Sequence, residues 1–199
     1  MSTHRIQRRP DVTSIERVGG AEALTVELHD YDEGWPEVYV DHRSRIQHAL
    51  IAANASAEDI EIEHIGSTSV PGLAAKPIVD IVITVDDITA EEDYLDALLA
   101  AGYVLRVREP GHRLVRAPAR DVHVHIYQRH DPAVGEYLLL RDRLRTDHDD
   151  RDLYENTKRE LMTRSWVDMD AYADAKTEVI RAIKERAIAA RAAHDDQRV

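Results

Sequence analysis

The segment from Pro77 to Val85 is an almost unbroken run of β-branched aliphatic residues, and it carries a single carboxylate, Asp80. A strand that is buried on both faces has this composition, whereas a half-exposed strand alternates apolar and polar residues. The run therefore predicts a central strand in a sheet that is covered on both sides.

The rest of the chain divides into segments with strand-like or helix-like periodicity. Trp35 and Pro36 begin a predicted helix, because proline is tolerated in the first turn. In the helix predicted over residues 89–101, we expect Tyr94, Leu95, Leu98 and Leu99 to face inward. The remaining strands are predicted over residues 25–29, 59–65, 103–107, 113–117 and 121–128, and the remaining helices over residues 133–145, 150–166 and 170–190. Strands in the middle with helices on either side predict an α/β or α+β fold, with one mixed sheet and a helical C-terminal part.

The length of 199 residues suits a single domain, which we place at residues 24–190. Residues 1–23 are polar and lack periodicity, so they are predicted to be a flexible leader, and residues 191–199 a polar tail. No apolar run approaches the roughly 20 residues that span a bilayer, and no apolar segment follows the basic N-terminus. We therefore expect a cytoplasmic protein without a membrane partner.

Charge is strongly unbalanced, with 38 acidic and 26 basic residues and a formal net charge of −12. Only four of the basic residues are lysines: Lys76, Lys158, Lys176 and Lys184. An acidic surface with few lysines is typical of a halophile-like, acidic proteome. The charge argues against duplex DNA as a partner, because DNA binding needs a basic surface. The absence of cysteine excludes a thiolate metal site and a cysteine nucleophile.

A turn rich in small hydroxyl residues precedes the central strand and comprises Gly66, Ser67, Thr68 and Ser69. Glycine allows a ligand to approach the backbone closely, and backbone N–H groups and hydroxyls can bind phosphate oxygens. Lys76 adds a cation, and Asp80 adds a carboxylate that could bind a divalent metal. The same residues also fit a tight turn that is capped by its own hydroxyls.

The stretch from Glu63 to Ile81, EHIGSTSVPGLAAKPIVDI, closely resembles the signature of the GrpB family, a branch of the nucleotidyltransferase superfamily. Further stretches resemble the same family over most of the chain, from about Val26 to Ile188. They are Val26–Pro36, Val122–His125, Leu139–Leu144, Tyr154–Lys158 and Tyr172–Lys176.

The resemblance implies a nucleotidyltransferase-like fold and a particular set of ligand contacts. In active members of the superfamily, the Gly-Ser turn holds a triphosphate and an Asp-x-Asp pair holds Mg²⁺. Asp80 matches the first aspartate, but Val82 stands at the second position, which strand alternation places on the same face. Arg141 and Lys158 match motif positions from which they could clamp an anionic group, whereas Tyr154 and Tyr172 are predicted to be packing residues.

Histidines could change the metal preference of such a site. We expect His64, Asp80, His123 and His125 to converge in one cleft, with Asp80, His123 and His125 as the catalytic candidates. One carboxylate with several imidazoles suits Zn²⁺ or Mn²⁺ better than Mg²⁺. Alternatively, His123 and His125 are half-exposed sheet residues and His64 caps the turn.

Three functions remain open at this point. The loss of the second carboxylate at Val82 favours a module that binds a nucleotide or another phosphorylated small molecule without proven catalysis. An active nucleotidyltransferase and a His/Asp metal-dependent hydrolase or phosphotransfer enzyme are the alternatives. In some bacteria a GrpB-like domain is fused to dephospho-CoA kinase, which implies that the domain works in the neighbourhood of a nucleotide or coenzyme A.

Overall fold

The computed structural model describes residues 10–19, 27–53, 60–167 and 169–196. Their contacts divide the chain into two compact units, which are described separately below. Unit 1 comprises Met1–Gly20, Tyr39–Glu63 and Ile81–Asp131, and unit 2 comprises Ala21–Val38, His64–Asp80 and Pro132–Val199.

Six strands form one mixed sheet in the order β1-β4-β5-β6-β3-β2. Their bounds are β1 Glu16–Arg17, β2 Ile62–Ile65, β3 Val79–Val85, β4 Val104–Glu109, β5 His112–Arg116 and β6 Val122–Gln128. From β1 to β6 the pairings are antiparallel, and β4 and β5 form a hairpin with Glu109 opposite His112. The prediction of a doubly buried strand is confirmed for β3, since Val79 and residues 81–84 are buried.

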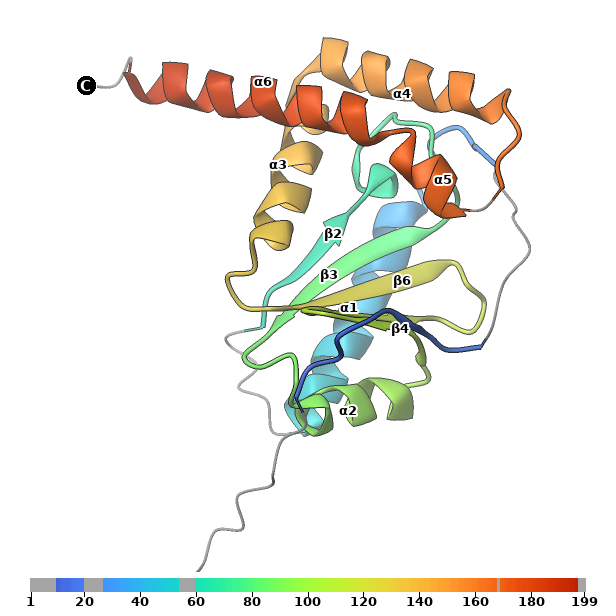
Figure 1. Ribbon diagram of the computed structural model, residues 1–199, viewed down its shortest axis with the longest axis vertical. Coiled ribbons are helices and arrows are strands. Elements are labelled where there is room, and N and C mark those ends of the chain that lie inside the picture. The colour runs from blue at the N-terminus through green and yellow to red at the C-terminus, as the bar shows by residue number, and fades with distance from the viewer. Residues whose placement is uncertain (1–9, 20–26, 54–59, 168, 197–199) are drawn as a thin grey trace, which may run out of the picture. The chain divides into compact units, whose positions relative to one another are not determined.

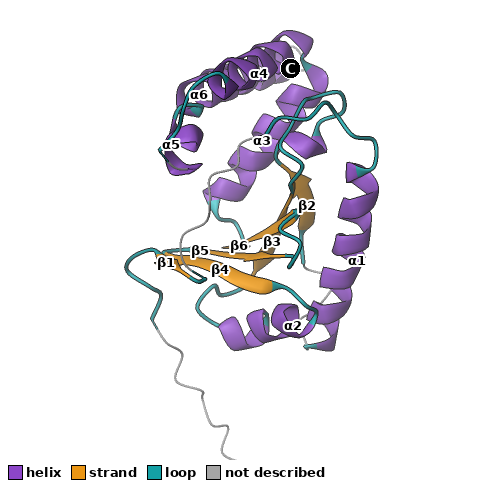
Figure 2. Cartoon of the chain, turned by 90° about the vertical axis from the view of Figure 1, so that its right-hand side faces the viewer, coloured by secondary structure: helices purple, strands orange, loops and turns teal. Residues whose placement is uncertain are grey.

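Helices α1 (Trp35–Ala52) and α2 (Leu95–Ala100) lie beside the sheet strands (Figures 1 and 2). The core of unit 1 consists of side chains from neighbouring strands that are fully shielded from solvent. They are Ile81, Ile83, Val115, Val124 and Ile126.

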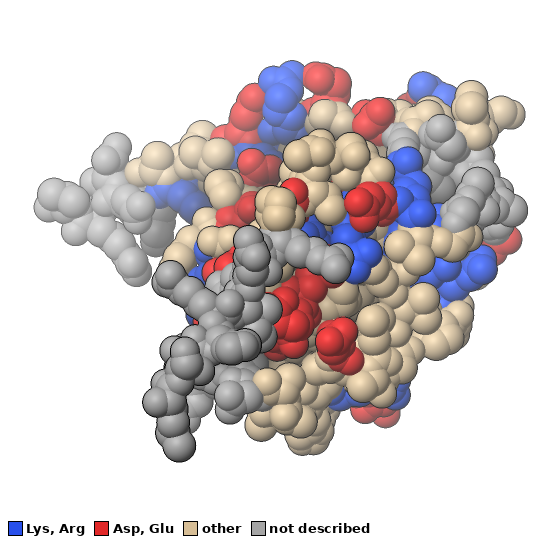
Figure 3. Space-filling model, turned by 60° about the horizontal axis from the view of Figure 1, so that its bottom comes forward, with Lys and Arg blue, Asp and Glu red and all other residues tan. Residues whose placement is uncertain are grey.

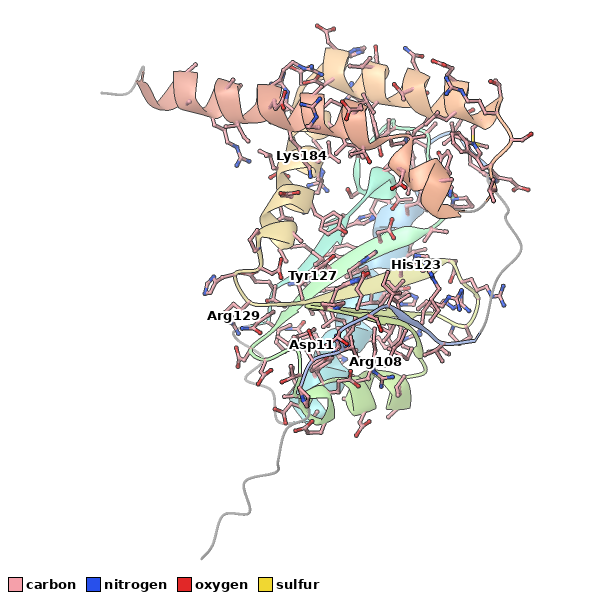
Figure 4. The ribbon with its side chains drawn as sticks, in the orientation of Figure 1. Asp11, Arg108, His123, Tyr127, Arg129 and Lys184 are labelled. Atoms are coloured by element: carbon pink, nitrogen blue, oxygen red, sulfur yellow. The ribbon has the colours of Figure 1, made fainter. Side chains whose placement is uncertain are left out.

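A buried arginine connects the N-terminal segment of unit 1 to the hairpin. The Arg113 side chain is only 2% exposed, and it donates hydrogen bonds to Asp11 (2.7 Å) and Glu91 (2.6 Å). It also donates to the backbone carbonyls of Glu109 and His112. Arg108 binds the same Glu91 carboxylate through Nε and Nη2. Figure 4 labels Asp11 and Arg108.

Unit 2 is mainly helical and contains α3 (Pro132–Thr146), α4 (His148–Met162), α5 (Met169–Asp174) and α6 (Thr177–Asp196). Helices α4 and α6 run side by side, and both contact α3 (Figure 1). The predicted C-terminal helical part is thereby confirmed. Its core joins the turn after β2 to these helices through Val70, Leu73, Leu144, Tyr154 and Ile183.

Several local predictions differ from the structure. Within the predicted leader, Glu16–Arg17 pairs with β4 and Asp11 binds Arg113, so this stretch is anchored by tertiary contacts. The helix predicted over residues 89–101 is shortened to α2 with a preceding 3₁₀ turn at Glu91–Asp93, and Leu99 is 39% exposed rather than inward-facing.

Two further differences concern the ends of the predicted elements. The helix predicted over residues 170–190 is interrupted between α5 and α6, and α6 continues to Asp196 through most of the predicted tail. Of the strand predicted over residues 25–29, residues 25 and 26 lie outside the described part, and His29 forms an isolated bridge with Ala75.

The surface carries charges of both signs. On the face shown in Figure 3, acidic and basic side chains are interspersed, without one broad basic patch. Among the described residues, none of the helices is long and apolar enough to cross a membrane.

Candidate functional site

The turn that follows β2 requires glycine at position 66. Gly66 has a φ of +71°, and a Cβ atom there would lie 2.6 Å from Asp80 Oδ2. Ser67–Ser69 then form one turn of 3₁₀ helix, and the Ser69 hydroxyl donates to the Gly66 carbonyl at 2.6 Å. The backbone of the turn and the Asp80 carboxylate therefore lie in close contact.

His64 is hydrogen-bonded to this turn. Its side chain is buried, and its Nε2 lies 3.1 Å from the Thr68 hydroxyl, which in turn donates to the Ile78 carbonyl. The imidazole is therefore the donor to Thr68. Burial lowers the pKa of His64 to about 4, helped by Arg145 and Arg141 and opposed by Asp80. His64 is thus neutral at pH 7, and it contacts the turn as the alternative interpretation predicted, through a side chain rather than the backbone.

Two arginines of α3 reach the backbone around the turn. Arg141 Nη1 donates to the His64 carbonyl at 3.1 Å, and Arg145 Nε donates to the Ser69 carbonyl at 2.9 Å. Arg141 also pairs with Asp142 at 2.8 Å. Both side chains therefore hold the backbone of the turn in place, a role that the sequence did not predict. The predicted clamping of an anion by Arg141 stays a prediction.

Lys158 approaches the turn from α4. It is only 3% exposed, and its Nζ donates to Ser67 Oγ at 3.1 Å and to the Ala74 carbonyl. The ring centroid of Tyr154 lies 4.8 Å from the same ammonium. Burial lowers the pKa of Lys158 to about 7, with Glu155 opposing the shift and Lys176 and Arg159 adding to it.

Two more lysines meet on one aromatic ring. The Nζ atoms of Lys76 and Lys176 lie 4.4 and 4.5 Å from the centroid of Tyr172. Burial and the neighbouring charge of Lys176 lower the pKa of Lys76 to about 8, and Asp80 opposes this shift. Burial also lowers the pKa of Lys176.

Together these side chains form a positively charged site within unit 2. We call Lys76, Lys158, Lys176, Ser67, Tyr154 and Tyr172 the lysine cluster. It brings three of the four lysines of the chain together, with Asp80 interacting electrostatically with Lys76 and Lys176, and Glu155 with Lys158. Repulsion and burial both disfavour three ammonium groups in one place, so a bound anion would stabilise their charged forms.

Tyr154 and Tyr172 were predicted to be packing residues, and both are buried. Tyr154 also contacts the ammonium group of Lys158, and Tyr172 contacts those of Lys76 and Lys176, which was not predicted. The Tyr-x-x-x-Lys spacing carried this signal, because residues four apart lie on the same face of a helix.

His123 and His125 occupy one face of β6 in unit 1, while Val122, Val124 and Ile126 are buried on the other. Figure 4 labels His123 and Tyr127 on this strand. His125 contacts a third imidazole, that of the buried His112, which the sequence analysis did not single out. Asp80 belongs to the unit 2 part of β3, the neighbour of β6 in the sheet order. Its predicted convergence with these histidines stays a prediction.

Comparisons with known proteins agree with the resemblance over most of the chain. The family model described as GrpB protein matches residues 25–186. The UPF0157 protein SCO7215 of Streptomyces coelicolor is 66% identical over 185 residues, which cover 93% of this chain and 96% of that protein. A dephospho-CoA kinase of Mycolicibacterium paratuberculosis is 31% identical over 81% of this chain but only 46% of the kinase.

A solved structure has the same fold. The crystal structure of the conserved protein GrpB from Enterococcus faecalis matches with a TM-score of 0.68 and 29% identity. The match covers 81% of this chain and 96% of that one.

Proposed function

Because the chain belongs to the GrpB family, we propose that it binds a nucleotide or another phosphorylated small molecule, the ligand class that the resemblance of its signature to nucleotidyltransferases implies. Phosphate oxygens would contact the lysine cluster and the hydroxyls of the Gly66–Ser69 turn. The observation that carries this proposal is the gathering of Lys76, Lys158 and Lys176 in a chain that has one other lysine.

The chemistry of the cluster suits phosphate better than a carboxylate. A phosphate group carries close to two negative charges and three acceptor oxygens, which several ammonium and hydroxyl donors can share. Ser67 already accepts a hydrogen bond from Lys158, so hydroxyl and ammonium are positioned together. The partial match to a dephospho-CoA kinase supports a ligand of the nucleotide or coenzyme A class.

Binding has better support than catalysis. Val82 is 1% exposed on the strand that carries Asp80, so the position of the second metal-binding aspartate is apolar and buried. Phosphoryl transfer with two metal ions needs several carboxylates to neutralise the ions. If the protein were an active nucleotidyltransferase, other residues of the chain would have to supply the missing metal-binding carboxylates.

The first test replaces Lys158 with methionine, which keeps the length of the side chain and removes the ammonium. A charge-assisted hydrogen bond contributes about 1.5–3 kcal/mol, so we expect ATP or tripolyphosphate to bind roughly 10–150-fold more weakly by isothermal titration calorimetry. Lys184→Met is the matched control, because Lys184 pairs with Glu136 on α3. Equal affinities for wild type and Lys158→Met would contradict the proposal, as would equal losses in both variants.

The pH dependence of binding provides a second test. With pKa values of about 7 for Lys158 and about 8 for Lys76, both amines lose protons in the free protein as the pH rises. A bound anion favours the protonated amines, so affinity should fall by up to about tenfold per pH unit for each proton taken up. Measurements from pH 7.5 to 9.5 avoid titration of the phosphate itself, whose second pKa is about 6. A constant affinity over this range would contradict the assignment.

A divalent metal ion is a further part of the proposal. We expect Asp80, His123 and His125 to supply its ligands, as predicted above from the sequence. One carboxylate and two imidazoles suit Zn²⁺ or Mn²⁺ better than Mg²⁺. Such an ion could bind a phosphate oxygen of the ligand and so add to its affinity. The zinc titration described below tests this part.

A further inference from the structure

Three side chains of unit 1 are linked by hydrogen bonds across strands β4, β5 and β6. They are Glu109, His112 and His125. His112 Nδ1 is bonded to the Glu109 carboxylate, directly across the hairpin turn. His112 Nε2 lies 3.2 Å from His125 Nδ1 on the next strand. We call these three residues the relay.

The imidazole of His112, the middle member of the relay, contacts Glu109, His125 and Tyr127. The rings of His112 and His125 are nearly parallel, with an interplanar angle of 14° and centroids 5.3 Å apart, and their facing nitrogens lie 3.2 Å apart. Tyr127, which pairs with His112 across the strands, stacks on its face at 4.5 Å and 20°. The side chain of His112 is only 9% exposed, so neither ring nitrogen can readily exchange its partner for water.

The order of donors in the relay follows from its first member. A carboxylate accepts hydrogen bonds and does not donate them, so the proton of a neutral His112 lies on Nδ1. The lone pair of His112 is then on Nε2 and faces His125. His125 must donate to it from Nδ1, which leaves the lone pair of His125 on Nε2.

We propose that Glu109 and His112 are positioning residues that hold His125 as the Nδ1–H tautomer, so that its Nε2 acts as a metal ligand or proton acceptor. The tautomer follows from the relay alone, whereas the role of Nε2 rests on the metal site proposed above. A metal-bound histidine commonly donates its other N–H to a carboxylate or a carbonyl group. Here a second imidazole lies between the histidine and the carboxylate.

His123 is the second imidazole of the proposed metal site. It lies two residues before His125 on the same face of β6, and the two rings meet edge to face with centroids 6.5 Å apart. Only His125 of this pair belongs to the relay. The proposal therefore predicts that the two histidines differ in tautomer stability even though they share a strand face.

Long-range ¹H–¹⁵N correlation spectra of metal-free protein at pH 7.5 test the tautomer directly. We expect His125, assigned through the loss of its signals in His125→Gln, to show the Nδ1–H pattern. In His112→Phe it should lose this preference, and in Glu109→Gln it should become mixed, because an amide can donate or accept. The matched control His148→Phe removes an exposed histidine that pairs with Asp152, and it should change nothing at His125.

The outcomes separate the two proposals. An Nε2–H pattern at His125 in the wild type would overturn the relay, and so would an unchanged pattern in His112→Phe. If His112→Phe does not fold, the wild-type and Glu109→Gln spectra still decide. Zinc titration then tests the metal role: wild type should bind, His123→Ala should lose binding, and Glu109→Gln should bind about 10–100-fold more weakly. Absence of zinc binding by the wild type would contradict the metal site and leave the tautomer result standing.

Discussion

Replacing Gly66 with alanine is expected to destabilise the protein by about 2–4 kcal/mol and to abolish measurable phosphate binding. The left-handed backbone at φ +71° costs about 1 kcal/mol for a residue with a side chain. In addition, the new methyl group would lie 2.6 Å from Asp80 Oδ2, so either the carboxylate or the turn must move. Overpacking of this kind typically costs about 1–3 kcal/mol. Urea unfolding and calorimetric titration with tripolyphosphate would measure the two effects.

Gly72 provides the control for this substitution. It also has a positive φ, +77°, but a Cβ atom there would meet nothing within 4 Å. Gly72→Ala should therefore cost only the backbone term of about 1 kcal/mol and leave phosphate binding intact. If the two variants lost equal stability and both kept binding, the close approach of Gly66 to Asp80 would have no role in the site.

Replacing Arg113 with methionine is expected to destabilise unit 1 by about 3 kcal/mol. Breaking a buried ion pair costs about 3–5 kcal/mol when a charge is left without compensation. We expect the lower end of this range, since Glu91 keeps Arg108 and Asp11 keeps the backbone N–H of Gly111. Denaturant titration followed by circular dichroism would measure the change.

A surface pair shows what an ordinary arginine contributes. Arg129 binds Asp86, whose side chain is 83% exposed, and Figure 4 labels this arginine. Arg129→Met should change the stability by no more than about 1 kcal/mol, because exposed ion pairs contribute little. A similarly small change for Arg113→Met would mean that the contacts of Asp11 and Glu91 do not anchor the N-terminal segment.

The elements that could be predicted from sequence are those whose cause is local. The helix that begins at Trp35 and the buried strand β3 follow from residues within each segment. The anchoring of residues 10–19 could not be predicted, because the partner of Asp11 is Arg113, which lies 102 positions later in the chain. Arg113 itself falls within a short strand of mixed polar and apolar residues, where nothing in the sequence marks it as buried.

Some residues of the candidate site could likewise be predicted from the sequence, and others could not. The resemblance identified the turn, Lys76 and Lys158, and the structure shows Lys158 in contact with Ser67. Lys176 was noted as a motif residue, and its spacing from Tyr172 fits their contact, but no spacing in the sequence predicts that Lys76 contacts the same ring. The role of His112 could not be predicted, because a single histidine next to a hairpin glycine forms no recognisable motif. Its contacts become evident only once its partners on the neighbouring strands are known.

The lowered pKa values of the lysine cluster also change how the acidity of the chain is to be understood. The formal net charge of −12 counts every lysine as a cation. Near neutral pH, Lys158, with a pKa of about 7, and to a smaller extent Lys76, with a pKa of about 8, are partly neutral, so the free protein is more negative than its composition states. Arginine could not serve in their place, because a guanidinium keeps its proton. A phosphorylated ligand that draws protons onto these amines would add less negative charge to the complex than it carries, so the cluster would offset part of the charge of an anion that binds to an already anionic protein.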